Sequence, residues 1–411
     1  MNIFDKRWIL TCFGTAVGAG ILFLPIQTGS GDIWSILFLT FIIFPVTYIS
    51  HRGITRITSS CPNKIGDIIE VIKYDLGFTA GFIVSILYFL SIVTLCVGYA
   101  TGLTNIVNSF LINQMHIFKI SRPIITFIVL AVLTLVLIGN EKIMTYVTSI
   151  MAFPLIILLV MISVYMIPHW NVIPMFTTFS IKRFLKSAFL LLPILIFAMN
   201  FSPICSLLGM SCRKQYNNIV ESVKHSDLIV KWNSIFLLIF IMFFVFSLFF
   251  STTPEILTYA KQNNIDALTA IALTYNDSIL LYVLPVISLL AIISSYFGHF
   301  IGTREGLNGI LMQIIIKNFN VKNDINTKRK LKIINTIILF TILWILAIFN
   351  PPILSVIGIL SAPIIAIYAY LMPVILMNKI QRLNIYRSKL AILVFIVGIF
   401  VIFGYFIGQI I

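Results

Sequence analysis

Two short stretches of this sequence place helix-breaking and polar residues inside long apolar segments. "GTAVGAGILFLP" at 14–25 holds three glycines and a proline. "FAMNFSPIC" at 197–205 holds Asn200, Ser202 and Pro203. Relative to alanine, glycine costs a helix about 1 kcal/mol and proline about 3 kcal/mol, so both stretches predict a local break. A break frees backbone N–H groups for an anion and carbonyl groups for a cation. These residues therefore favour noncovalent binding of a charged ligand.

Covalent and metal chemistry have little support in the sequence. The five cysteines form neither a CxxC pair nor a metal-ligand spacing. No GxxxxGK[ST] phosphate loop occurs, which argues against ATP hydrolysis by this chain. An enzyme would need clustered His, Asp or Glu, and a channel would need an acidic ring or a filter-like repeat. We find neither pattern, so we expect no enzyme and no cofactor, and a channel is disfavoured.

The elements that must position these residues are membrane-spanning helices. The chain has 411 residues, of which 60% are hydrophobic and only 10% charged, whereas soluble domains usually carry about 25% charged residues. A helix needs about 20 apolar residues to cross a bilayer. Roughly eleven stretches meet that length: 8–29, 32–50, 77–110, 123–139, 143–167, 185–211, 230–253, 278–302, 333–349, 353–376 and 389–410. The fold class expected is an all-α integral membrane protein.

The net charge of +15 indicates topology rather than a nucleic-acid partner. If the N-terminus lies inside and eleven helices alternate, inside segments hold 22 of the 28 Lys and Arg residues. Outside segments hold the other six. This asymmetry follows the positive-inside rule. It predicts an inside N-terminus and an outside C-terminus.

The two interrupted segments belong to the first and sixth predicted spans. They occupy matching places if spans one to five and six to ten are two halves. Because five is odd, the halves would cross the membrane in opposite directions, as in many secondary transporters. The alternative for the first segment is close helix packing, since Gly14, Gly18 and Ala19 fit a small-xxx-small stripe.

Several stretches from the first span to the tenth resemble one family. They are "FGTAVGAGILFLPI" at 13–26, "HRGITRI" at 51–57, "YATGLTN" at 99–105, "AMNFSPI" at 198–204, "FGHFIGTREGLNG" at 297–309, and "NPPIL" with "APIIA" at 350–366. The chain resembles the bacterial hydroxy and aromatic amino acid permeases, within the amino acid–polyamine–cation superfamily. The "NFSPI" and "GHFIGTREGLNG" stretches favour its serine/threonine branch.

The resemblance implies a leucine-transporter-like core of two inverted five-helix repeats plus one extra helix. Over a single transporter domain, 1–411, we expect these parts at 8–167, 185–376 and 389–410. It also implies uptake of amino acids driven by an ion gradient, in the cytoplasmic (inner) membrane of a bacterium.

A zwitterionic amino acid brings a carboxylate and an ammonium group to such a site. We expect the backbone of the first break to bind the carboxylate, because glycine lets a backbone approach closely; the candidates are Thr15, Ala16, Gly18, Ala19 and Gly20. Carbonyls and side chains of Phe197, Asn200 and Ser202 suit the ammonium and the side chain. Tyr99 could add a hydroxyl, or it could be an interfacial anchor. Ser202 could instead bond its own helix.

Ion coupling involves the eighth predicted span. His299 is the only histidine expected inside the membrane, where ionisable groups are functional candidates, although a neutral histidine packed against Ser295 is the alternative. Better-known members of the branch carry a lysine just before the position of Ser295, whereas this chain has Ser294. Two adjacent hydroxyls could ligate sodium instead. Glu305 is expected to be an inner-surface charge or a gate residue.

These inferences predict a secondary symporter that imports a small amino acid, serine or threonine, together with protons. The alternatives are sodium-coupled symport, amino acid exchange, and an aromatic substrate. The expected partners are the amino acid, the coupling cation and the lipid bilayer, with no nucleic acid.

Overall fold

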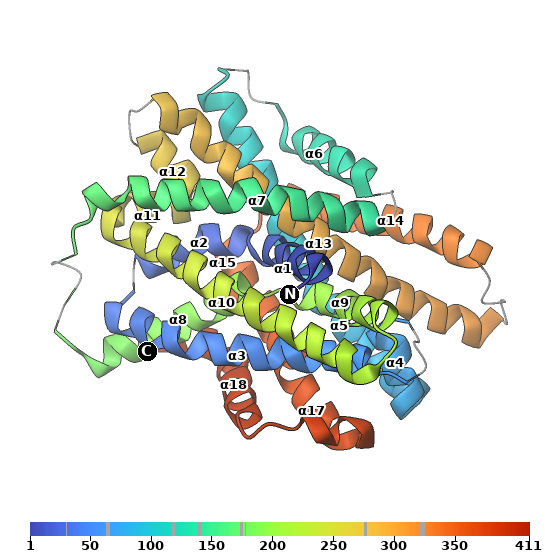
Figure 1. Cartoon of the computed structure of the whole chain (residues 1–411). Helices are drawn as coiled ribbons and strands as arrows, with labels where there is room; N and C mark the ends of the chain where they lie inside the picture. Colours follow the sequence, from blue (N-terminus) through green and yellow to red (C-terminus); the bar gives the residue numbers. More distant parts are fainter. Residues whose placement is uncertain are drawn as a thin grey trace.

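The structure of the chain is a computed structural model, and its helices run side by side across the view of Figure 1. It describes residues 1–29, 31–62, 66–116, 120–137, 141–172, 176, 178–274, 278–319 and 325–411. Within these ranges the secondary structure is helical, with no strand. The all-α class is therefore confirmed.

Nine of the described helices are long and apolar enough to cross a membrane, and a bent pair at the N-terminus adds a tenth. The predicted span 123–139 coincides with α6 (Arg122–Leu137), which is apolar but has only 16 residues. The chain is thus a multi-pass membrane protein. The exact number of eleven spans stays a prediction.

Both predicted breaks are present. α1 (Ile3–Ala16) and α2 (Ala19–Thr28) meet at an angle of 50°, with Val17 and Gly18 between them. We call these two residues the first break. α8 (Ile181–Ala198) and α9 (Ser202–Gln215) are separated by residues 199–201, the second break.

The other long helices enclose these two pairs. Their bounds are α3 Ile33–Ser59, α5 Phe78–Asn113, α7 Glu141–Tyr165, α10 Ile219–Ser251, α13 Ser278–Phe319, α14 Ile325–Ile348 and α18 Ala391–Ile410. The tenth predicted span consists of α15 (Ile353–Ser355), a π-helical turn η3 (Val356–Ser361), α16 (Ala362–Ile365), a second π-helical turn η4 (Ala366–Leu371) and α17 (Met372–Lys379). Short helices complete the chain: α4 Ile68–Leu76, η1 Ile167–His169, α11 Pro254–Gln262, α12 Ala267–Thr274 and η5 Gln381–Tyr386.

Three helices extend well past their predicted apolar spans. α3 continues to Ser59 rather than 50, α10 starts at Ile219 rather than 230, and α13 reaches Phe319 rather than 302. Polar pairing explains the first two, because the guanidinium Nε of Arg56 donates to Asp227 Oδ1 at 2.9 Å and so joins the end of α3 to α10. Apolar length alone marks the membrane core and not the helix end.

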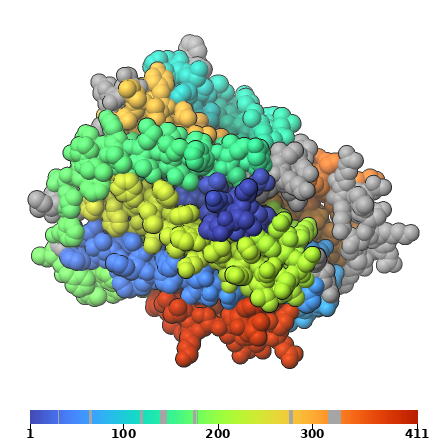
Figure 2. Space-filling model, in the orientation of Figure 1, coloured from blue at the N-terminus to red at the C-terminus, as the bar shows by residue number. Residues whose placement is uncertain are grey.

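The interrupted first pair lies at the centre of the bundle. α1 packs against α7, α10 and α13, and α2 packs against α8. Figure 2 shows the N-terminal helix between α7 and α10, while α17 and α18 project at one edge of the molecule. The packing brings the first break against both α8 and α13.

At the start of α5, Gly77 has a φ of +89°, a conformation that glycine adopts without strain.

Candidate functional site

Gly18 in the first break lies directly against α13 and α5. A Cβ added at Gly18 would overlap Ser295 Cβ and would lie 3.1 Å from Tyr99 Cε1. Only a hydrogen fits in this space, so glycine is required here for close packing. The structure therefore brings together three predicted site residues from three different helical segments.

The two broken spans touch each other at Gly20. A Cβ at Gly20 would lie 2.6 Å from both Ala198 Cα and Phe197 Cδ1. Ala198 is the last residue of α8, so the beginning of α2 packs against the point where α8 ends. This contact places the free N-terminus of α2 beside the second break.

A hydrogen-bonded group of residues connects α13 to the last turn of α1. Ser295 Oγ donates to the carbonyl oxygen of Thr15 at 2.5 Å. The Nδ1 of His299 lies 2.8 Å from the carbonyl oxygen of Ser295, so this nitrogen donates, and Nε2 lies 3.5 Å from the Tyr99 hydroxyl. Tyr99 also packs on Phe197, with ring centroids 5.7 Å apart. Burial of Tyr99, which is 1% exposed, disagrees with the alternative of an interfacial anchor.

Ser294 faces away from this group. Its hydroxyl donates to the carbonyl oxygen of Ala291 on its own helix at 3.0 Å. The two adjacent hydroxyls of Ser294 and Ser295 therefore have different partners. Among the described residues, no group of three or more His, Cys, Asp or Glu side chains could hold a metal ion.

The second break is held by a histidine that we did not expect inside the membrane. His51 on α3 is fully buried, and its Nε2 accepts the backbone N–H of Phe201 at 3.1 Å. Its Nδ1 lies 2.9 Å from the carbonyl oxygen of Thr47, and its ring stacks on that of Phe201. The expectation that His299 is the only embedded histidine is therefore wrong. The predicted span ended at 50 because charged residues follow, but the helix carries His51 into the core.

Two polar side-chain atoms, one in the second break and one at the start of α9, are buried without a hydrogen-bond partner among the described residues. Asn200 Oδ1 accepts the backbone N–H of Ser202 at 3.2 Å, while Asn200 Nδ2 and Ser202 Oγ are buried and bond nothing among the described residues. The alternative that the Ser202 hydroxyl bonds its own helix is not seen. Buried polar groups without partners carry a cost of about 1–3 kcal/mol, and functional sites are common places for them.

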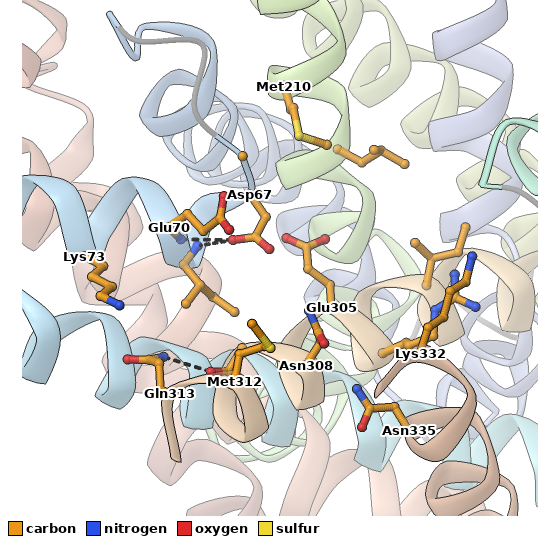
Figure 3. Close-up of a pocket in the computed structure, with 16 residues that line it drawn as sticks. Asp67, Glu70, Lys73, Met210, Glu305, Asn308, Met312, Gln313, Lys332 and Asn335 are labelled. Atoms are coloured by element: carbon orange, nitrogen blue, oxygen red, sulfur yellow. Dashed lines mark hydrogen bonds between the residues drawn. The ribbon is translucent and has the colours of Figure 1, made fainter. Parts of the chain in front are cut away.

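A cavity of about 370 Å³, with both charged and apolar side chains in its wall, lies beyond the second break and is lined by α4, α9, α13 and α14 (Figure 3). We call it the α4–α13 cavity. Glu305 on α13 lines it, and its carboxylate accepts from Ser206 Oγ at 2.5 Å and lies 3.3 Å from the Tyr88 hydroxyl. The Tyr88 hydroxyl is also 2.9 Å from the carbonyl oxygen of Pro203, to which it can donate.

Comparison with protein-family models decides the family. The model of the tryptophan/tyrosine permease family matches residues 8–409. The chain belongs to this family. It is 33% identical to the serine transporter SdaC of Escherichia coli K12, over 98% of this chain and 94% of the relative. It is 31% identical to the threonine/serine transporter TdcC of Edwardsiella piscicida, over 94% of this chain and 90% of the relative. This family member is therefore a transporter and not an enzyme.

Solved structures of a manganese transporter and of a Na⁺-coupled sialic acid symporter share the fold of this permease. A mutant of the manganese transporter of Eremococcus coleocola aligns with a TM-score of 0.60 and 12% identity, over 98% of this chain and 85% of that one. A Na⁺-coupled sialic acid symporter in a substrate-bound outward-open state aligns with a TM-score of 0.57 and 12% identity, over 99% of this chain and 90% of that one. The leucine-transporter-like fold class is confirmed, while the repeat boundaries 8–167 and 185–376 stay a prediction.

Proposed function

We propose that this permease imports serine or threonine across the cytoplasmic membrane of a bacterium, coupled to protons. The observation that carries the proposal is the packing of the two broken spans at Gly20, which lies against Ala198, together with the packing of Gly18 against Ser295 on α13. The names of the two curated relatives that we cite support the choice of a hydroxyl amino acid.

In this proposal the substrate carboxylate binds at the start of α2. No side chain caps this helix end, and its first N–H groups carry the positive end of the helix dipole. Thr15, Ala16, Gly18, Ala19 and Gly20 form this part of the site. The ammonium group and the hydroxyl side chain then lie near the second break, beside Phe197, Asn200 and Ser202. Tyr99 closes the site from α5.

The coupling proton is assigned to His299. Its Nδ1 donates to the Ser295 carbonyl on its own helix, and its Nε2 lies 3.5 Å from the Tyr99 hydroxyl, so Nε2 faces the proposed substrate site. A proton on Nε2 would turn this atom from an acceptor into a donor toward Tyr99. Substrate binding and proton binding would thereby influence each other through one side chain.

Sodium coupling is the second candidate, and one observation favours it. The Ser295 hydroxyl is bonded to the Thr15 carbonyl oxygen, which places two hard oxygen ligands together at the first break. Ser294 would have to rotate away from Ala291 to join them. Exchange against an internal amino acid and an aromatic substrate are the further alternatives.

Uptake into proteoliposomes tests the proposal. We expect radiolabelled L-serine or L-threonine to accumulate when an inward pH gradient is imposed without sodium, and His299→Ala to reduce this accumulation. Each unit of an inward pH gradient supplies about 1.4 kcal/mol per proton, which suffices for about tenfold concentration. Accumulation that needs sodium and ignores the pH gradient would replace protons by sodium. Ser295→Ala should then weaken the apparent affinity for sodium.

A further inference from the structure

The α4–α13 cavity contains a buried amide that bonds nothing among the described side chains. Asn335 on α14 is fully buried and lines the cavity, yet neither its Oδ1 nor its Nδ2 has a hydrogen-bond partner there. Gln313 on α13 also lines the cavity, is 4% exposed, and leaves its Oε1 unpartnered. A carboxamide without partners costs stability unless a ligand or water satisfies it. These amide groups could therefore form hydrogen bonds with a ligand in the cavity.

The charged side chains around the cavity carry both signs. Asp67, Glu70 and Glu305 supply carboxylates, and Lys73, Arg304 and Lys332 supply cations. In Figure 3, Asp67 and Glu70 lie on one side of the view and Lys332 and Asn335 on the other, with Glu305 and Asn308 between them. A simple anion would meet the carboxylates, and a simple cation would meet the lysines and the arginine. A ligand that carries one charge of each sign fits both sets.

The size of the cavity suits a small molecule. Its volume of about 370 Å³ is at the lower end of the range of roughly 300–1,000 Å³ typical of ligand sites. The cavity also lies next to the second break, because the Tyr88 hydroxyl donates to the Pro203 carbonyl beside that break at 2.9 Å and lies 3.3 Å from Glu305 at the cavity.

We propose that the α4–α13 cavity is a second binding site for a zwitterionic amino acid. The ammonium group binds between Glu305 and Asp67, and the carboxylate binds toward Lys332 and the Nδ2 of Asn335. This site rests on the proposed function, because it takes the same substrate as the central site.

Equilibrium binding of radiolabelled L-serine to the purified full-length protein tests the second site. We expect two molecules of serine per chain in the wild type. We expect one in Gly18→Leu, because the leucine side chain blocks the central site and leaves the cavity site free to bind. Asn335→Leu, of similar size, should also bind one, with affinity for the cavity site reduced at least tenfold. Asn233→Leu is the matched control, because Asn233 is equally buried, has no partner for either amide atom among the described residues, and does not line the cavity.

Lys332→Met provides a second variant in case Asn335→Leu does not fold, and it should also leave one site. One molecule per chain in the wild type, lost in Gly18→Leu, would overturn the second site and leave the proposed function standing. Two molecules per chain in both cavity variants would overturn it as well. A wild-type protein that binds neither serine nor threonine would overturn the proposed function itself, and the cavity site with it.

Discussion

At Gly18 the structure has room for a hydrogen atom and for nothing larger. Gly18→Leu would drive its side chain into Ser295 and Tyr99, and overpacking of this kind costs about 1–3 kcal/mol. We expect serine uptake to fall by at least about tenfold, because the leucine side chain occupies the proposed substrate site and a loss of about 1.4 kcal/mol of binding free energy already gives a factor of ten. Initial rates of serine uptake, normalised to the amount of inserted protein, measure this.

Gly98→Ala is the control for this substitution. A Cβ at Gly98 on α5 meets no atom within 4 Å, although the residue directly precedes Tyr99. Alanine there should preserve uptake and stabilise the helix by up to about 1 kcal/mol. Equal loss of uptake in both variants would show that the effect of Gly18→Leu is not local to the first break.

His51 acts as a positioning residue for the second break. His51→Phe keeps a ring that can stack on Phe201 but removes the Nε2 that accepts the Phe201 N–H. Leaving this buried N–H without an acceptor should destabilise the protein by about 1–3 kcal/mol. Thermal unfolding in detergent should show a lower midpoint, with weaker substrate binding. An exposed histidine, His169, serves for comparison, and an unchanged midpoint in His51→Phe would contradict the assigned role.

At the scale of elements, Asp266 joins the α11–α12 segment to α13. Its carboxylate accepts the backbone N–H of Leu268 and of Thr269 at the start of α12, and the hydroxyl of Ser288 on α13 at 2.7 Å. Burial raises the pKa of this carboxyl above its usual value, and the hydrogen bonds oppose that rise. The folded protein therefore holds a proton that the unfolded chain has already lost, over a window that begins near pH 4.

This linkage predicts the sign of a pH effect. Stability should fall as the pH rises from about 4 through the raised pKa of Asp266, because ionisation is easier in the unfolded chain. Asp266→Asn cannot ionise, so the difference in unfolding midpoint between the variant and the wild type should change across this window. Parallel curves for the two proteins would show that Asp266 does not titrate there.

Helix breaks were easier to predict from sequence than helix ends. Glycine and proline interrupt a helix for local reasons, so both breaks could be located at Gly18 and near Asn200. The continuation of α3 past residue 50 depends on the pairing of Arg56 with Asp227, which are 171 positions apart in the chain. For the same reason, His51 was not predicted to lie inside the membrane. Its position directly after the predicted apolar span 32–50 could have indicated that the helix continues through it. The cavity of Glu305 and Asn335 depends on four helices and has no local signature.

At the scale of the whole molecule, the positive charges predict the orientation in the membrane. Gln381 in η5 and Lys261 in α11 are both exposed and should lie on opposite sides, inside and outside respectively. Single cysteines at these positions should react with a membrane-impermeant reagent from opposite faces. The five native cysteines are free and buried, so they should contribute little background. Labelling of both positions from one side would refute the predicted topology.

The contact between Gly20 and Ala198 also limits how this permease can acquire new substrates. Gly20 has no side chain, and a Cβ there would already collide with the backbone of Ala198. No substitution at Gly20 can therefore create more space at this contact. In the proposed site, extra room for a bulkier amino acid would have to come from the packed rings of Phe197 and Tyr99. Recognition of the part common to all amino acids is thereby separated from selection of the side chain. In this proposal, substitution of a few aromatic residues would change the substrate specificity during evolution, while the backbone of the two breaks stays the same.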